Sequence, residues 1–410
     1  MSTSTDAPTV ESGTPATGPL AGIRVVEMGS LIAGPFCGQL LGDFGAEVIK
    51  LEDPASGDPM RRWMVYDDTG ESLWWPIIAL NKQSVTVDLR TPEGQAVARR
   101  LIATADVLVE NFRPGTLERW GLGYDELSRD NPGLVMTRVT GYGQDGPYSA
   151  RAGFGSIGEA MGGLRFVTGD PSSPPSRVGI SIGDSLAGLF SALGTSMALV
   201  ARNRTGRGQV VDTAIYEAVL AVMEALVPLY QHGGVIRERT GAILPGVAPS
   251  NVYPTDDGDS VVIGANRDTV FARLVETMGR PDLLPALATH EARAQRQEEL
   301  DEILATWTIA QPTEALLKAL HDAGVPAGRL YTAPDMLADE HFAARGALST
   351  LVHRTLGDFT QQGPTPRLSE TPGSLRWLGP ELGEHTASVL TGLLGMRHDE
   401  VDGLAQRKVI

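Results

Sequence analysis

An aspartate that follows a glycine at the expected start of a helix is the first candidate for covalent chemistry. Gly183 and Asp184 open a helix that we expect to end near Ala201. An aspartate in this position is ordinarily an N-cap, because its oxygens accept the free N–H groups of the first turn. The same N–H groups and the helix dipole keep the carboxylate ionised, and the preceding glycine leaves room for a bulky substrate. The local pattern therefore allows two roles for Asp184, a helix cap and a covalent nucleophile.

A serine three residues earlier is a second candidate nucleophile. Ser181 is the centre of a G-x-S-x-G pattern at residues 179–183, which is typical of the nucleophile elbow of serine hydrolases. That elbow follows a strong apolar strand, whereas here the Pro/Ser-rich stretch 171–177 comes almost directly before it. The histidines downstream stand in no recognisable triad context. A structural serine is favoured, and a serine hydrolase is kept as an alternative.

A glycine pattern at residues 141–146 resembles the dinucleotide-binding fingerprint G-x-G-x-x-G. In that fingerprint a helix starts at the loop, and its N-terminus holds the pyrophosphate. Here Pro147 follows at once, and residues 148–155 do not read as a helix. We therefore interpret the pattern as a turn and expect no tightly bound nicotinamide or flavin.

The charge balance excludes two large classes of partner. The chain has 34 basic and 50 acidic residues, which gives a formal net charge of −16. Broad nucleic-acid binding and adhesion to an anionic membrane both need a basic surface. Only four of the basic residues are lysines. Arginines or backbone N–H groups must therefore meet any anionic ligand.

Cysteine and histidine usage limits the available chemistry. The single cysteine, Cys37, excludes an internal disulfide and a cysteine-based metal cluster, and it suits a reducing, cytoplasmic setting. The seven histidines are scattered, so we predict no metal site. The first of them is His232. Acid–base chemistry before that point must therefore come from carboxylates, tyrosines or water.

Alternating strand and helix patterns predict an α/β fold. Short apolar segments separated by helical segments favour parallel βαβ units and a nucleotide-binding type of domain. The expected strands are 22–29, 46–52, 84–89, 106–111, 133–141 and 209–213, and the expected helices are 34–44, 92–103 and 124–128.

The rest of the chain changes in character. The uncharged stretch 185–201 is short for a bilayer and rich in small residues, so we expect a buried helix in a soluble protein. A long amphipathic helix at 214–230 and a Gly/Pro-rich connector at 232–251 follow. Residues 1–18 are polar and predict a disordered tail. Later predictions are a strand at 260–265, helices near 268–278, 295–307, 312–323, 382–394 and 399–405, and a loop-rich stretch at 336–378.

Several long motifs resemble one family. They lie at residues 22–58, 80–94, 105–127, 140–154, 182–189, 203–218 and 383–390, and they span nearly all of the chain after residue 18. Together they resemble the family III CoA-transferases of the CaiB-BaiF type. This family includes formyl-CoA, carnitine and succinyl-CoA-dependent enzymes and the related methylacyl-CoA racemases.

The resemblance selects Asp184 as the nucleophile. The nucleophilic aspartate of the family lies in a G-D-x-x-x-G helix start, which is residues 183–188 here. The resemblance implies that Asp184 is both cap and nucleophile. It also implies transfer of CoA from an acyl-CoA to a carboxylic acid through an aspartyl-CoA thioester.

The same resemblance implies a set of CoA contacts. They are Ile32, Ala33, the region of residues 50–53, Leu80, Asn81, Asn111, Phe112, Arg113, Arg119, Thr140, Gly141 and Tyr142. CoA enters as a substrate, and no tightly bound cofactor or metal is implied. Relatives often carry a basic residue directly after K-x-E, whereas this chain has Asp53. An anionic side chain cannot clamp a phosphate, so that contact is in doubt.

Two further patterns bear on the reaction. Racemases of the family use a histidine in a segment that corresponds to residues 152–156, which hold none, so transfer is favoured over racemisation. An acyl-CoA hydrolase that uses Ser181 is the other alternative. Residues 241–251 lack the consecutive glycines of formyl-CoA:oxalate enzymes and are more like members that use succinyl-CoA with a dicarboxylate.

The family fold implies an interlocked homodimer. Each chain would have a large Rossmann-type domain, formed by residues 19–230 and the return segment 336–410. A smaller α/β domain would span residues 231–335.

Overall fold

The computed structural model describes residues 17–65 and 69–410, so most of the predicted tail, residues 1–18, lies outside the described residues. The chain forms two compact units. The first contains Met1–Leu164, Val178–Ala225 and His341–Ile410, and the second contains Arg165–Arg177 and Leu226–Glu340.

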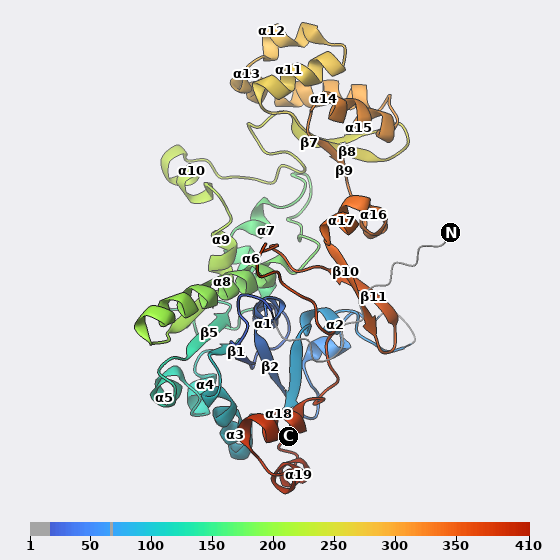
Figure 1. Cartoon of the computed structure of the whole chain (residues 1–410). Helices are drawn as coiled ribbons and strands as arrows, with labels where there is room; N and C mark the ends of the chain where they lie inside the picture. The colour runs from blue at the N-terminus through green and yellow to red at the C-terminus, as the bar shows by residue number, and fades with distance from the viewer. Residues whose placement is uncertain (1–16, 66–68) are drawn as a thin grey trace, which may run out of the picture. The chain divides into compact units, whose positions relative to one another are not determined.

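The first unit is built on a parallel sheet (Figure 1). Within the described residues its six strands lie in the order β3-β2-β1-β4-β5-β6, and each neighbouring pair is parallel. The strands are β1 (Arg24–Glu27), β2 (Glu47–Glu52), β3 (Lys82–Thr86), β4 (Val107–Glu110), β5 (Val135–Thr140) and β6 (Val210–Ala214). The predicted α/β fold with parallel strands is confirmed. The order of the strands reverses between β1 and β4.

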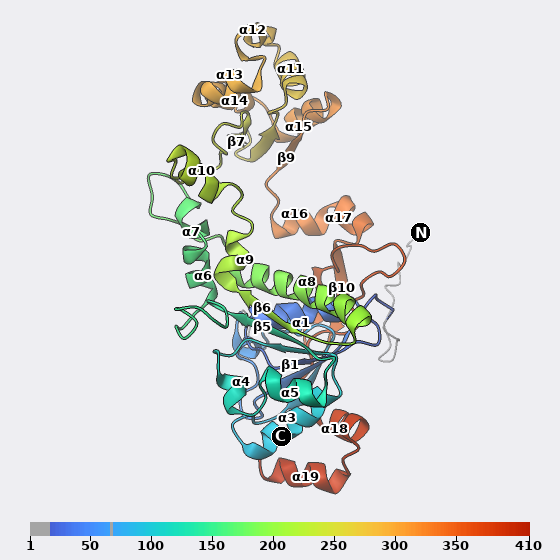
Figure 2. The ribbon, with the colours of Figure 1, turned by 90° about the vertical axis from the view of Figure 1, so that its left-hand side faces the viewer.

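Helices cover both faces of this sheet (Figure 2). α1 (Ala33–Asp43) and α8 (Ile182–Thr205) lie on one face. The other face carries α3 (Pro92–Ala103), α5 (Tyr124–Asp130), α18 (Thr386–Leu394) and α19 (His398–Gln406). Shorter helices are η1 (Pro59–Arg62), α2 (Trp75–Ile78), α4 (Thr116–Arg119), α6 (Gly155–Met161), α9 (Ile215–Leu220) and α17 (Glu340–Arg345). α7 (Leu164–Val167) begins at the last residue of the segment Met1–Leu164 and lies mostly in the second unit.

Successive strand residues belong to two different cores. Val25 and Val48 pack in the layer of α1 and α8, whereas Val26 and Ile49 pack in the layer of α3. Side chains alternate along a strand, and both faces of a parallel sheet are buried. This double burial is why the strands read as continuous apolar runs in the sequence.

α8 packs as a core helix of this unit. By length and composition alone it is long and apolar enough to cross a membrane, as core helices of soluble proteins also can be. In the fold it contacts α1 and the sheet through Ala192, Ala198 and Leu199. The packed helix predicted from the small residues of this stretch is therefore present, and it begins earlier and ends later than expected.

The prediction of one long helix at residues 214–230 is wrong. Two helices occupy this stretch, α9 (Ile215–Leu220) and α10 (Leu226–Gly233), and Glu224 between them has a φ of 53°. Pro228 explains the break, because proline has no N–H to donate to the preceding turn and is tolerated only near a helix start. It is the third residue of α10.

The stretch 336–378, predicted to be loop-rich, contains a hairpin. β10 (Leu348–His353) pairs antiparallel with β11 (Gly357–Gln362), and Gly357 has a φ of 73°. The two strands mix polar and apolar residues because the ribbon buries little of either face. Their pairing depends on the turn and on cross-strand contacts such as that between Thr350 and Thr360, which join at 2.8 Å.

The second unit is a smaller α/β assembly. Its three described strands, β7 (Ser250–Pro254), β8 (Ser260–Gly264) and β9 (Ala327–Arg329), form an antiparallel sheet in the order β7-β8-β9. Phe271 and Leu274 lie at the centre of its core. Its helices are α10, α11 (Asp268–Thr277), η2 (Pro281–Leu283), α12 (Leu284–Leu287), α13 (His290–Gln295), α14 (Gln297–Thr308), α15 (Thr313–Asp322) and α16 (Ala333–Ala338).

Candidate active site

The carboxyl-terminal edge of the parallel sheet gathers most of the predicted site. In open α/β sheets ligands bind outside the carboxyl ends of the strands, where the strand order reverses. The turn after β1 leads to Ile32 and Ala33, the turn after β4 carries residues 111–113, and β5 ends at Thr140. Because the strands are parallel and adjacent, these segments lie at one edge although they are far apart in the sequence.

Asp184 lies in the first turn of α8. The helix begins at Ile182 and its N-cap residue is Ser181, so the predicted N-cap role of Asp184 is wrong. The residues before Asp184 are already helical, and the Ser185 N–H donates to the Ser181 carbonyl at 3.0 Å. In this position the dipole at the N-terminus of the helix still favours the ionised carboxylate.

Glycines determine the space around the Asp184 carboxylate. A Cβ atom on Gly155 would lie 2.1 Å from Oδ2 of Asp184, so the carboxylate rests against the backbone at the start of α6. A Cβ on Gly183 would meet the Gly155 carbonyl oxygen at 3.0 Å, and one on Gly188 would meet the Ala33 carbonyl oxygen at 2.8 Å. The two glycines of G-D-x-x-x-G therefore let α8 approach α6 and α1 closely.

The turn after β5 packs against the segment that enters α6. A Cβ on Gly141 would lie 2.5 Å from Cα of Gly153, and Oγ1 of Thr140 accepts a hydrogen bond within the turn at 2.9 Å. The ring of Tyr142 meets that of Tyr148 edge-on, with centroids 6.0 Å apart. This G-x-G-x-x-G stretch is therefore a turn beside the candidate nucleophile.

Asn111 joins the turn after β4 to the turn after β1. Its Oδ1 accepts from the Ser30 N–H at 2.9 Å, and its Nδ2 donates to the Ser30 carbonyl at 2.8 Å. Gly29 and Gly34 leave room for this side chain, because a Cβ on either would lie within 3.3 Å of it. Ile32 and Ala33 are buried, and their contact with CoA stays a prediction.

Two exposed arginines and an aromatic side chain follow β4. The ring of Phe112 packs edge-on against Trp120, with centroids 5.3 Å apart. Arg113 and Arg119 are exposed, and Arg119 donates to the Thr116 hydroxyl at 3.1 Å. A guanidinium group suits a phosphate because its N–H groups form a planar fork.

A buried ion pair holds this turn in place. Arg138 donates to Glu110 at 2.6 Å and to Glu118 of α4 at 2.7 Å. Burial raises the pKa of the Glu110 carboxyl, although Arg138 opposes the rise. The pair thereby connects the end of β4 to the helix that carries Arg119.

Lys50 has a structural role in the region of residues 50–53. Its Nζ contacts Oε1 of Glu27 at 2.8 Å, Oδ2 of Asp58 at 2.9 Å and the Gly29 carbonyl oxygen at 2.8 Å. Burial lowers the pKa of Lys50, but the two carboxylates outweigh it and hold the pKa above its ordinary value. Lys50 therefore joins the turns after β1 and β2 from inside the fold.

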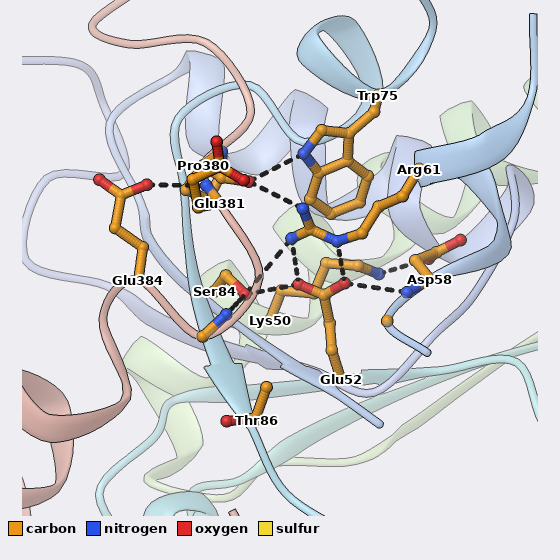
Figure 3. A network of polar contacts seen from close by, with 12 residues as sticks. Lys50, Glu52, Asp58, Arg61, Trp75, Ser84, Thr86, Pro380, Glu381 and Glu384 are labelled. Atoms are coloured by element: carbon orange, nitrogen blue, oxygen red, sulfur yellow. Dashed lines mark hydrogen bonds and ion pairs between the residues drawn. The ribbon is translucent and has the colours of Figure 1, made fainter. Parts of the chain in front are cut away.

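A second network continues from Glu52 to the return segment (Figure 3). Arg61 donates to both carboxylate oxygens of Glu52 at 2.8 Å and stacks 3.7 Å above the Trp75 ring. Arg61 and Trp75 both donate to the Pro380 carbonyl, at 3.0 and 2.9 Å. Ser84 also donates to Glu52, at 2.6 Å. The loop between β2 and η1 is thus held at both ends.

Leu80 and Asn81 do not join the other predicted contacts. They precede β3 and lie at the amino-terminal edge of the sheet, where both are buried. Asn81 donates to Oδ1 of Asp43 and to the Ser374 carbonyl, both at 2.9 Å, and accepts from the Arg376 N–H at 2.7 Å. Their role in CoA binding stays a prediction.

A pocket of about 270 Å³ opens at the carboxyl-terminal edge, between the turns after β1, β2, β3 and β4. Its apolar lining includes Leu51, Val87, Leu89, Phe112 and Trp120. Its charged lining includes Asp53, Asp88 and Arg90. Sequence reasoning did not select Arg90, although a basic residue just after a strand of a lysine-poor chain was an available signal.

Residues 20–386 match the family described as CoA-transferase family III. The chain belongs to this family. A succinyl-CoA–D-citramalate CoA-transferase of Chloroflexus aurantiacus is 56% identical over 394 residues, which cover 96% of this chain and 98% of that protein. A succinyl-CoA–L-malate CoA-transferase beta subunit of the same species is 43% identical, covering 97% and 100%. A CaiB/BaiF family protein from Brucella suis has a TM-score of 0.81 and 35% identity, covering 92% and 100% of the two chains.

These likenesses confirm the predicted family, and the protein is an enzyme, a CoA-transferase.

The strand that a serine nucleophile elbow requires is missing, because the described chain between α7 and α8 holds no strand before Ser181. The sequence of this family III CoA-transferase gave no reason to select Glu159, which lies close to Gly183 in the structure. This carboxylate is buried on α6, and its Cγ lies 3.0 Å from where a Cβ on Gly183 would be.

Proposed function

We propose that this family III CoA-transferase moves CoA from succinyl-CoA to a dicarboxylic acid, with Asp184 as the covalent nucleophile. The proposal rests on the position of the Asp184 carboxylate. It lies in the first turn of α8, against the bare backbone of Gly155 and beside the turn after β5. Asp184 is partly exposed, and Gly155 places no Cβ beside its carboxylate.

The proposed reaction begins when Asp184 attacks the thioester carbonyl of the donor. The C–S bond breaks, which yields a mixed anhydride and the CoA thiolate. The thiolate then attacks the aspartyl carbonyl, so that the donor acid leaves and an aspartyl-CoA thioester remains. The acceptor carboxylate reverses these two steps. No proton shuttle is needed, in agreement with the lack of histidine before His232.

Relatives support the choice of substrates. Proteins that are 56% and 43% identical to this chain are named for succinyl-CoA with D-citramalate or L-malate, and one of Agrobacterium fabrum that is 36% identical is named for succinate and glutarate. All these acids carry two carboxyl groups. We propose succinyl-CoA as donor and a hydroxylated dicarboxylate of the citramalate or malate type as acceptor.

We propose that the sheet acts as a Rossmann-type platform for the nucleotide end of CoA. The strand order β3-β2-β1-β4-β5-β6 supports this assignment, because dinucleotide-binding sheets use the same order and bind at its reversal. Arg113 and Arg119 would contact phosphates, and Thr140 to Tyr142 would line the thioester end. A cytoplasmic location and a lack of tightly bound cofactor stay predictions.

We infer a homodimer from the outer face of α8. Leu189, Leu193, Met197 and Val200 recur at helical spacing on this face and are about half exposed or more. A contiguous apolar stripe of this kind marks a protein interface. A second copy of the chain is the occupant that we propose, in the interlocked arrangement of the family. The domain bounds 19–230, 231–335 and 336–410 are part of the same proposal.

The test replaces Asp184 with asparagine. Asp184→Asn keeps the shape of the side chain but removes the nucleophilic carboxylate. Transfer from succinyl-CoA to citramalate, malate or glutarate should therefore fall by several orders of magnitude, while the melting temperature and CoA binding persist. In wild-type protein incubated with succinyl-CoA alone, mass spectrometry should detect an aspartyl-CoA adduct that hydroxylamine removes.

Ser181→Ala is the matched control on the same helix start. Transfer should be only modestly affected in this variant. Near-normal transfer in Asp184→Asn would contradict the proposal. So would a loss of turnover confined to Ser181→Ala together with release of free CoA in the absence of an acceptor acid, which is the outcome expected of a hydrolase.

A further inference from the structure

A cation that the proposed reaction does not use lies between β5 and α6. Arg151 is the one basic residue between Tyr142 and Gly155 in the sequence. Its guanidinium lies 3.5 Å from the ring centroid of Tyr148, and that ring meets the ring of Tyr142 edge-on. The Arg151 N–H also donates to the Tyr148 carbonyl, at 2.9 Å. Both the backbone and the side chain of Arg151 are therefore fixed against the turn after β5.

The edge of this guanidinium is available to an anion. Arg151 is exposed, and among the residues that the structure describes none accepts a hydrogen bond from its side chain. Arg138, a cation on β5, is by contrast bound to Glu110 and Glu118. A guanidinium that stacks on a ring through its face keeps the N–H groups at its edge, and these form a planar fork that matches a carboxylate. Arg151 can therefore bind a carboxylate with two hydrogen bonds.

The segment that carries Arg151 leads directly to the candidate nucleophile. Gly153 packs against Gly141, since a Cβ on either would lie 2.5 Å from Cα of the other. Two positions later, Gly155 rests against the Asp184 carboxylate. Gly155 is four positions after Arg151, a stretch that spans at most about 14 Å when fully extended. The guanidinium and the nucleophile are thus carried by one short segment that is anchored at the turn after β5.

The proposed substrates require a positive group at such a place. In succinate, malate and citramalate two carbon atoms separate the carboxyl groups, so the second carboxylate stays close when the first is at Asp184. Like charges at short distance repel each other, and the chain as a whole has a net charge of −16. A local cation must offset this repulsion. In a chain with four lysines, an arginine such as Arg151 can supply it.

We propose that Arg151 binds the distal carboxylate of the succinyl donor and of the acceptor acid, and so makes the site selective for dicarboxylates. Tyr148 holds the guanidinium in place, and its ring and that of Tyr142 offer apolar surface to the carbon atoms between the two carboxyl groups. Arg151 takes no part in bond making and determines specificity through binding. The assignment deepens the proposed function and rests on it, because it concerns the same acids.

The first experiment measures recognition of the distal carboxylate without any reaction. The probes are S-(3-carboxypropyl)-CoA, an uncleavable thioether analogue of succinyl-CoA, and S-butyl-CoA, which differs by having a methyl group in place of the carboxylate. Binding to the full-length protein is measured by calorimetry. The wild type should bind the carboxypropyl analogue at least about tenfold more tightly than the butyl analogue. Arg151→Ala should bind the two analogues equally, with its affinity for S-butyl-CoA unchanged.

Two further variants separate this role from a structural one. Arg151→Lys keeps the charge but loses the planar fork, so it should retain only part of the preference. Arg129 is likewise exposed but lies on α5, which covers the face of the sheet opposite α8. Arg129→Ala should therefore show the full preference of the wild type. Equal losses for both analogues in Arg151→Ala, or a preference that survives in this variant, would mean that Arg151 does not bind the distal carboxylate, and the proposal would be wrong.

Kinetics separate failure of this inference from failure of the proposed function. With succinyl-CoA and butyryl-CoA compared as donors, Arg151→Ala should lower kcat/KM about tenfold for succinyl-CoA only. Wild-type CoA transfer from succinyl-CoA, with a donor preference that does not change in Arg151→Ala, would overturn the inference and leave the proposed function in place. A wild type that prefers the carboxypropyl analogue through Arg151 but transfers no CoA would overturn the proposed function and leave the assignment of Arg151.

Discussion

Gly155 has no side chain at the one point where a Cβ would lie 2.1 Å from Oδ2 of Asp184. Gly183 and Gly188 similarly admit the backbones of α6 and α1. The position of the proposed nucleophile is therefore set by three residues that contribute no functional group. A nucleophile must be held close to its productive geometry, because a displacement of about 1 Å can cost about 100-fold in rate.

Gly155→Ala tests this dependence. The added methyl group must displace the Asp184 carboxylate, so we expect kcat for CoA transfer to fall about 100-fold or more. The melting temperature should change little, because the carboxylate can move where the backbone cannot. Gly179→Ala is the matched control, since a Cβ there meets nothing within 4 Å. Equal activity of the two variants would show that the Gly155 contact does not position the nucleophile.

At the scale of elements, the return segment is attached to the sheet through α1 and β3. Asn81, whose φ is 59°, bonds to Asp43 at the end of α1 and to the backbone of Ser374 and Arg376. Arg376 also donates to the Gly42 carbonyl, at 3.2 Å. The segment that leads to α18 therefore shares a polar junction with the first βαβ unit of the sheet.

This junction predicts a pH dependence of stability. Burial raises the pKa of Asp43 to about 7, although the Asn81 hydrogen bond opposes the rise. The unfolded chain loses this proton near the ordinary value of 3.8. Between these values the native state binds more protons than the unfolded state, so the contribution of Asp43 to stability decreases as the pH rises from about 4 to about 7.

Asp43→Asn removes this titration and keeps an acceptor oxygen for Asn81. We expect the variant to gain at least about 2 °C in melting temperature relative to wild type at pH 8, and to show no such gain near pH 4. Scanning calorimetry across this range measures the effect. The exposed Asp130→Asn serves as control and should follow the wild type at each pH. A parallel pH profile for Asp43→Asn would contradict the assignment.

At the scale of the whole molecule, α8 has one face in the core and another that its own unit leaves exposed. The buried face carries Ala192, Ala198 and Leu199, while Met197 and Val200 on the outer face are 61% and 62% exposed. Such a helix is stable in water when a partner covers the second face. The proposed homodimer provides one.

Met197→Glu places a charge at the centre of this outer face. Burying an unpaired carboxylate is strongly unfavourable, and interlocked chains form their dimer as they fold, so we expect Met197→Glu chains to fail to assemble into the dimer. Light scattering coupled to size exclusion measures the mass. Arg204→Glu, an exposed change in the last turn of the same helix, should leave the dimer intact. A monomeric wild type, or an unchanged Met197→Glu dimer, would exclude this face as the interface.

The local sequence pattern was sufficient to predict much of the secondary structure of the first unit. The buried parallel strands are continuous apolar runs between turn signals, and α3 lies at the residues expected of it, 92–103. Asp184 stood out because a carboxylate next to glycine at a helix start is a recognisable combination. The long motifs then identified the family. Each of these signals depends on residues that are near one another in the sequence.

Tertiary structure decided the features that depend on distant residues. The contact of Gly155 with Asp184 and the pairing of Arg90 with Asp53 join residues that are 29 and 37 positions apart. The start of α8 at Ile182 was also not predicted. The break before α10 and the β10–β11 ribbon were likewise missed. A periodic pattern reports which face of an element is buried, but not which element covers it. That choice is made by the packing of the whole fold, and the site is built from it.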